Sequence, residues 1–274
     1  MYRPKITTAL SLTVALALSR SALAQTSKTV RLHVNPRWKE CSFQLDSSLT
    51  QSAWHQFTQE AGIVTYFRPL DDAAPMGRGQ FELSLLQWKT GIHDSDPAWN
   101  DTFVHPDSTH WLFEGDGLKF PGLTARAGIT DRTDAGVYFT KSPGANYGFY
   151  GGQLQHNFFH NAVDGWAASA RMSFVSMYGP KDIAFSVYGV DVLASKRFAL
   201  FSDWASVSPY VGGSTYMSRA HEKSSVVDLT DENVLGVEGM IGAAVHISAA
   251  NIAAEYGVAR VRSFSLKVGV SRHI

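Results

Sequence analysis

The stretch LGVEGMIGAAVHI, residues 235–247, carries an apolar or small side chain at every odd position. The same alternation resumes twice before the chain ends, over residues 252–258 and 264–270, with one charged residue on each minority face. Those charged residues are Glu238, Glu255 and Lys267. A strict period of two predicts β-strands with one apolar face and one small or polar face. The chain is therefore predicted to end in three long strands joined by short turns.

Two kinds of β-barrel orient such faces in opposite directions. In a transmembrane barrel the apolar face points outward to lipid and the polar face points into the lumen. In a soluble, lipocalin-like barrel the apolar face would enclose a ligand and the charges would face water. Aromatic residues near the predicted strand ends favour the transmembrane kind, because interfacial girdles form there. These aromatic residues are Trp166, Tyr178, Tyr188, Trp204, Tyr210, Tyr216 and Phe264.

The composition agrees with a membrane barrel and argues against a nucleic-acid partner. The mean hydropathy is −0.10 although 12% of the residues are aromatic, as expected where alternate residues face a polar lumen. Basic and acidic residues balance at 24 each, so the charge indicates no nucleic-acid partner. The single cysteine, Cys41, cannot form an intramolecular disulfide.

The first 24 residues have the features of an export signal. Arg3 and Lys5 give a positive start, and an apolar stretch follows over residues 6–18. Ala22-Leu23-Ala24 then supplies a small-x-small cleavage pattern, and the apolar run is too short to span a membrane. We expect residues 1–24 to be a cleaved signal peptide.

Residues 25–79 are predicted to form a periplasmic segment or a plug in the lumen. Two short stretches within them, 29–34 and 63–67, have the composition of strands. A turn-rich linker follows over residues 71–79. If both short stretches pair with the wall, they add two strands to it.

A helix is predicted between these two stretches, over residues 49–60. Apolar residues recur there at helical spacing, and Ser47 or Ser48 is the expected cap.

Residues 80–274 are predicted to form an antiparallel up-and-down transmembrane β-barrel. The alternation gives ten strands, near residues 80–90, 120–129, 135–140, 146–158, 164–177, 183–196, 203–217, 233–247, 250–260 and 263–274. An even number places both ends of the wall in the periplasm. The long links 91–119 and 218–232 then lie outside the cell. Twelve strands, with the two N-terminal stretches included, is the alternative.

An export signal, alternating strands and a strand at the carboxyl terminus resemble bacterial outer-membrane β-barrel proteins over residues 80–274. The chain ends in Ser271-Arg272-His273-Ile274, whereas such proteins usually end in an aromatic residue that the insertion machinery reads. Residues 127–137 resemble a strand–turn–strand unit of barrels that take up fatty acids and aromatic hydrocarbons. The general resemblance implies an outer-membrane location, with membrane lipid and the insertion machinery as partners.

One arrangement resembles the catalytic residues of outer-membrane lipid A deacylases: His246-Ile247-Ser248 with Glu255 downstream. Nucleophilic catalysis needs a base to take the serine proton and an acid to orient that base. The predicted topology places His246 and Ser248 at the periplasmic rim, whereas lipid A occupies the outer leaflet. We therefore predict that the protein is not an enzyme.

The polar stretch 91–116 contains His93, His105 and His110 together with several aspartates. Imidazole and carboxylate groups are metal ligands, but these spacings match no compact site. A solvated loop is the favoured interpretation. No metal and no other cofactor is predicted.

Six charged residues have inward parity and form the candidate site: Glu82, Arg126, Arg171, Glu238, Glu255 and Lys267. Mixed charges inside a narrow barrel either pair with one another and fill it, or line a permeation path. Ten strands favour a filled interior, and twelve leave room for a narrow channel. The leading hypothesis is a passive channel or transporter for a small solute. The alternative is a closed structural or surface-interaction barrel that acts through its extracellular loops.

Overall fold

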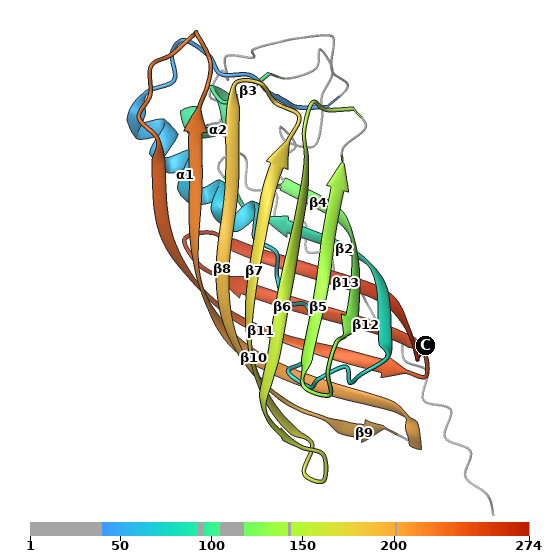
Figure 1. The fold of residues 1–274 in the computed structure, drawn as a ribbon. Coiled ribbons are helices and arrows are strands. Elements are labelled where there is room, and N and C mark those ends of the chain that lie inside the picture. Colours follow the sequence, from blue (N-terminus) through green and yellow to red (C-terminus); the bar gives the residue numbers. More distant parts are fainter. Residues whose placement is uncertain (1–39, 93–95, 105–117, 142–143, 201, 274) are drawn as a thin grey trace, which may run out of the picture.

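The computed structural model describes residues 40–92, 96–104, 118–141, 144–200 and 202–273. Within these residues, ten antiparallel strands close into one barrel (Figure 1). The wall strands are β2 (Gln80–Thr90), β4 (Leu118–Gly128), β5 (Thr133–Lys141), β6 (Gly148–Asn161), β7 (Trp166–Tyr178), β8 (Ile183–Lys196), β10 (Ser202–Glu222), β11 (Glu232–Ile247), β12 (Ala250–Val258) and β13 (Arg262–His273). A short strand, β9 (Phe198–Leu200), pairs with β10. No helix in the described part of the chain is long and apolar enough to cross a membrane.

The wall forms by pairing each strand with the next one along the chain, and a single additional pairing closes the ring. That pairing joins β13 to β2, from Ser263 opposite Thr90 to His273 opposite Gln80. The longest strand, β10, is hydrogen-bonded on both sides, to β8 and to β11. The ten-stranded barrel predicted from the alternation is therefore confirmed.

The two ends of the barrel carry different connections. At the end that we call the turn end, where β2 begins and β13 finishes, the links are short: 129–132, 162–165, 197–201 and 248–249. The opposite end, the loop end, carries the links 91–117, 142–147, 179–182, 223–231 and 259–261. Figure 1 shows the C-terminus at the turn end and the helices at the loop end.

Side chains alternate across the wall as a membrane barrel requires. On β11, Leu235 and Val237 are 75% and 73% exposed, whereas Glu238 is 3% exposed. The apolar face therefore points outward and the charged face inward, which is the transmembrane orientation and not the soluble one. The prediction that Tyr210 and Tyr216 belong to an aromatic girdle was wrong, because from Ser206 onward the even positions of β10 face the interior and both rings are buried.

Helix α1 (Gln51–Thr65) differs from its prediction at both ends. The cap is Thr50, whose Oγ1 accepts a hydrogen bond from the Ala53 amide at 3.3 Å, while Ser48 bonds to Asp46 instead. The helix continues to Thr65, so the strand predicted over 63–67 was wrong. A short apolar run that is buried on all sides has no period by which helix and strand can be told apart.

The twelve-stranded alternative is wrong, because residues 63–67 end α1 and continue as extended chain inside the barrel. The other stretch proposed for the wall, 29–34, lies outside the described residues, as does the predicted signal peptide.

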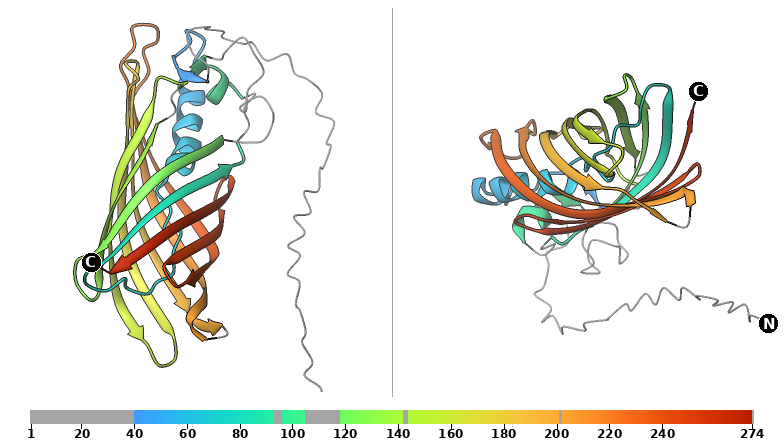
Figure 2. Two further views of the ribbon diagram at one scale, coloured as in Figure 1. Left: turned by 90° about the vertical axis from the view of Figure 1, so that its right-hand side faces the viewer. Right: turned by 90° about the horizontal axis from the view of Figure 1, so that it is seen from below.

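A small apolar cap fills the loop end around α1. It comprises residues 40–65 and 96–104, which include α1, α2 (Pro97–Asn100) and a two-stranded sheet of β1 (Ser42–Phe43) and β3 (Phe103–Val104). Aromatic rings from the cap pack together, with the Phe43 and Phe103 centroids 4.3 Å apart. Tyr147, Phe149 and Phe185 of the barrel join the same core. Figure 2 shows α1 lying along the barrel interior toward this end.

Candidate functional site

The chain between α1 and β2 runs through the barrel from the loop end to the turn end. We call residues 66–79 the lumen segment; residues 66–73 are all buried. Just before it, the Val64 carbonyl accepts a hydrogen bond from the Trp88 indole, on the loop-end half of β2, at 2.6 Å. Near the turn end, the Met76 amide bonds to the Asp134 carboxylate at 3.2 Å. The lumen segment therefore crosses the barrel interior.

Two wall cations meet at Asp71 of the lumen segment. Arg126 Nη1 lies 2.5 Å from Asp71 Oδ2, and Arg126 Nη2 lies 2.9 Å from Asp134 Oδ2. Lys267 Nζ lies 2.8 Å from the same oxygen of Asp71 and 2.9 Å from Glu82 Oε1. All five side chains are buried. Since buried charges are stable only when paired and hydrogen-bonded, this cluster ties the lumen segment to β2, β4, β5 and β13.

The carboxylate of Glu82 is held from three directions. In addition to Lys267, it accepts hydrogen bonds from Ser84 Oγ at 2.7 Å and from Asn251 Nδ2 at 2.9 Å. Its partners come from β2, β12 and β13, so this carboxylate joins three neighbouring wall strands. Such a fixed carboxylate has a structural role in this conformation.

Arg171 on β7 forms a second cluster at mid-height. Its Nε donates to Asp191 Oδ2 at 2.7 Å, its Nη1 donates to Gln153 Oε1 at 2.7 Å, and its Nη2 donates to the Phe67 carbonyl. The second oxygen of Asp191 accepts hydrogen bonds from Tyr66 Oη at 2.5 Å and from Ser214 Oγ. The cluster therefore binds both the backbone and a side chain of the lumen segment.

Arg68 of the lumen segment lies near the carboxylates of Glu238 and Glu255, and each carboxylate keeps one oxygen without a hydrogen bond. Its Nη2 lies 3.5 Å from Glu238 Oε1 and donates to the Ile63 carbonyl at 3.1 Å. Glu255 accepts a hydrogen bond from Tyr210 Oη at 3.0 Å. Arg68 Nε and Nη1, Glu238 Oε2 and Glu255 Oε1 have no hydrogen-bond partner among the described residues. Hydrogen bonding is therefore least complete in this part of the interior network.

The backbone of the lumen segment is also fixed to opposite parts of the wall. The Ala73 amide donates to Ser195 Oγ at 3.0 Å, and the Ala73 carbonyl accepts from Asn157 Nδ2 at 2.8 Å. One glycine of the wall also leaves room for a side chain of the lumen segment. A Cβ on Gly189 would lie 2.2 Å from the Tyr66 ring, so only glycine admits that ring against β8.

The structure places all six sequence-predicted site residues inside the barrel, each no more than 4% exposed. It joins Arg126, Lys267 and Glu82 in one cluster and leaves Arg171 in another. Sequence reasoning missed their partners in the wall, Asp134 and Asp191, although both have inward parity. It also missed Arg68 and Asp71, because an extended chain without a repeat gives no signal about which way a side chain points.

A pocket of about 270 Å³ opens at the turn end, beside Asp71, Asp72 and His246. The ligand atoms of these three residues lie within 4.8 Å of one another, close enough for a metal ion. His246 Nε2 lies 3.5 Å from Asp72 Oδ2. However, Asp71 already contacts Arg126 and Lys267, whose charges oppose a divalent cation at the same oxygen. The histidines of the stretch 91–116, His93, His105 and His110, lie outside the described residues.

The His246, Ser248 and Glu255 arrangement is not assembled. On the paired strands β11 and β12, His246 lies opposite Asn251, whereas Glu255 lies opposite Gly242. Four residues along a strand correspond to about 13 Å, so Glu255 is too far away to orient the imidazole. Its partner is Tyr210 instead, and the carboxylate nearest His246 is that of Asp72.

No family model matches the sequence, and no curated protein does. Among solved structures, the β domain of the Bordetella autotransporter Brka aligns at 13% identity with a TM-score of 0.41, covering 72% of this chain and 99% of that one. An outer membrane channel from Pseudomonas putida F1 aligns at 10% identity with a TM-score of 0.40, covering 76% and 100%. The outer membrane enzyme PagL aligns at 11% identity with a TM-score of 0.33, covering 50% and 98%. At this level of similarity, none of the three carries an inference about the function of this chain.

Proposed function

We propose that this protein is a closed barrel of the bacterial outer membrane that acts through its capped loop end and not as an open pore. The observation that carries the proposal is the lumen segment, which is bonded to the wall at several heights. Arg126 and Lys267 hold Asp71, Arg171 holds the Phe67 carbonyl, and Ser195 holds the Ala73 amide. A solute would have to displace these contacts together in order to pass.

The outer-membrane location is supported by the wall itself. The outward face is apolar, the interior is charged, and the two longest links, 91–117 and 223–231, lie at the same end. These are features of outer-membrane barrels, whose loops face the outside of the cell. The loop end, with its apolar cap, is then the surface presented to the surroundings.

Gated passage of a small solute is the second candidate. It is favoured by the polar pocket of about 270 Å³ at the turn end, which reaches the interior charges Glu82 and Arg126. In this reading the lumen segment moves to open a path, and the interior charges set its selectivity. Enzymatic activity has less support, because Glu255 does not orient His246.

Conductance of the refolded protein in a planar bilayer separates the two candidates. We expect no conductance steps, because the paired charges and the lumen segment fill the interior. Folding must be shown on the same sample, by the shift in gel mobility that a folded barrel loses on heating, and insertion by co-flotation with lipid vesicles. Regular steps from inserted protein would contradict the closed barrel. Arg126→Gln and Arg171→Gln would then change the ion selectivity of those steps if a gated path exists.

A further inference from the structure

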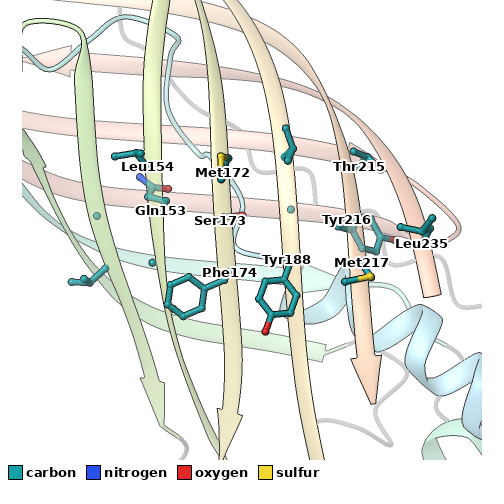
Figure 3. A pocket seen from close by; sticks show the side chains of 16 residues that line it. Gln153, Leu154, Met172, Ser173, Phe174, Tyr188, Thr215, Tyr216, Met217 and Leu235 are labelled. Atoms are coloured by element: carbon teal, nitrogen blue, oxygen red, sulfur yellow. The ribbon is translucent and has the colours of Figure 1, made fainter. Parts of the chain in front are cut away.

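The outer wall is hollowed on its loop-end half, across β5 to β8, β10 and β11 (Figure 3). The groove has a volume of about 750 Å³. Outward side chains that line it include Leu154, Met172, Phe174, Tyr188, Val190 and Met217. Gly152 faces outward between Val137 and Phe174 on the neighbouring strands, so part of the groove floor has no side chain. The groove is therefore apolar, and it lies within the face that contacts membrane hydrocarbon.

A polar row borders this groove on the side of the loop end. Tyr188, Met217 and Leu235 lie side by side on β8, β10 and β11 and form the last apolar row. One row nearer the loops are Ser186, Arg219 and Asn233, again side by side. In Figure 3 the Tyr188 hydroxyl points toward the loop end.

Arg219 gives the border its charge. It shares the outward face of β10 with Thr215 and Met217, which line the groove, and its side chain is exposed. It has no ion-pair partner among the described residues. The cation is thus available to an anion from the membrane, at the height where the apolar face of the wall ends.

We propose that the groove and Arg219 together bind one anionic membrane lipid, with an acyl chain in the groove and the phosphate on the guanidinium. This inference rests on the membrane location proposed above. The apolar lining fits a hydrocarbon chain, and Ser186 and Asn233 supply polar side chains beside the phosphate. A guanidinium binds phosphate with two parallel hydrogen bonds, so Arg219 suits the headgroup better than a neutral residue would.

A second copy of the chain fits the same surface less well. Most homodimers are two-fold symmetric and bring the same patch of each subunit together. That arrangement would bring the two Arg219 charges toward each other, and Asp231, the carboxylate one row nearer the loops, already pairs with His221. The lipid supplies the missing negative charge.

Native mass spectrometry of the full-length protein in detergent tests the proposal, with phosphatidylglycerol and phosphatidylcholine as probes. We expect one phosphatidylglycerol to be retained about fivefold more strongly than phosphatidylcholine, the effect of one basic residue near a membrane surface. Arg219→Gln should abolish this headgroup preference. Val190→Trp should fill the groove and weaken the binding of both lipids.

Two matched controls should behave as the unmodified protein does. Val192→Trp makes the same change on the same face of β8, two residues from Val190 and outside the groove lining. Arg262→Gln removes an exposed arginine from the start of β13, away from the groove. Equal retention of the two lipids by the unmodified protein, or a loss in the controls equal to that in the variants, would overturn the proposal. So would a mass spectrum dominated by a dimer that Val190→Trp dissociates.

Insertion of the same samples into lipid vesicles keeps this result separate from the proposed function. Protein that fails to insert would contradict the membrane location. Protein that inserts but shows no headgroup preference would contradict the lipid site alone.

Discussion

Arg171 is a buried cation that stabilises the barrel by bonding to several groups. It holds the Asp191 carboxylate, the Gln153 amide and the Phe67 carbonyl at once. Arg171→Met would leave Asp191 buried without its cation, which we expect to lower the free energy of unfolding by about 3–5 kcal/mol. Urea unfolding of the refolded protein, followed by tryptophan fluorescence, measures the change. Arg262→Met, at an exposed arginine, is the control and should shift the free energy by less than about 0.5 kcal/mol. Equal unfolding midpoints for the two variants would contradict a stabilising role for the Arg171 cluster.

The interior charges show what can be predicted from the sequence for single residues. Parity within a strand places Arg126 and Lys267 in the interior, because the period of two fixes the face of every wall residue. Parity cannot tell which charge meets which, since cross-strand register and the twist of the wall decide that. For Arg68 and Asp71 it says nothing at all, because an irregular chain has no period. The candidate site was therefore predictable as a set of wall charges and not as a network built around the lumen segment.

At the scale of elements, helix α1 makes the cap a unit with its own core. Phe57 contacts Phe43, Trp99 and Phe103, the rings that hold α1, β1, α2 and β3 together. Cys41 belongs to the same core and is fully buried, and burial raises the pKa of its thiol above the usual range. Alkylation requires the thiolate, so Cys41 should react with a maleimide far more slowly in the folded protein than in urea.

Removing a ring from this core should release that protection. Phe57→Ala leaves a cavity worth about 3–5 kcal/mol, which we expect to open the cap and to speed the alkylation of Cys41. Phe264→Ala deletes the same atoms from an outward ring that is 53% exposed, and should leave the alkylation rate unchanged. Rapid labelling of the unmodified folded protein, or equal rates in the two variants, would show that the cap does not depend on α1 packing.

The wall strands and helix α1 differ in how well the sequence predicts their bounds. The wall strands were predictable to within a few residues, because long alternation is a strong signal. The end of α1 was not predictable, since Ile63 and Val64 are buried on all sides and either secondary structure could bury them.

For the whole molecule, the lumen segment has a topological consequence. The wall begins at Gln80 on the turn end, yet the cap that precedes it in sequence lies at the loop end. If the loops face outward from the cell, residues 40–50, which precede α1, are displayed on the cell surface as well. Ser47 is an exposed residue of the cap, and Val163, 95% exposed, lies in a link at the turn end. In a Cys41→Ala background, Ser47→Cys should react on intact cells with a polymer-linked maleimide that is too large to cross the membrane. Val163→Cys should react only after the outer membrane has been opened.

The reverse pattern would mean that the barrel is inserted with its cap in the periplasm. Labelling of both positions on intact cells would mean that the barrel does not separate two compartments.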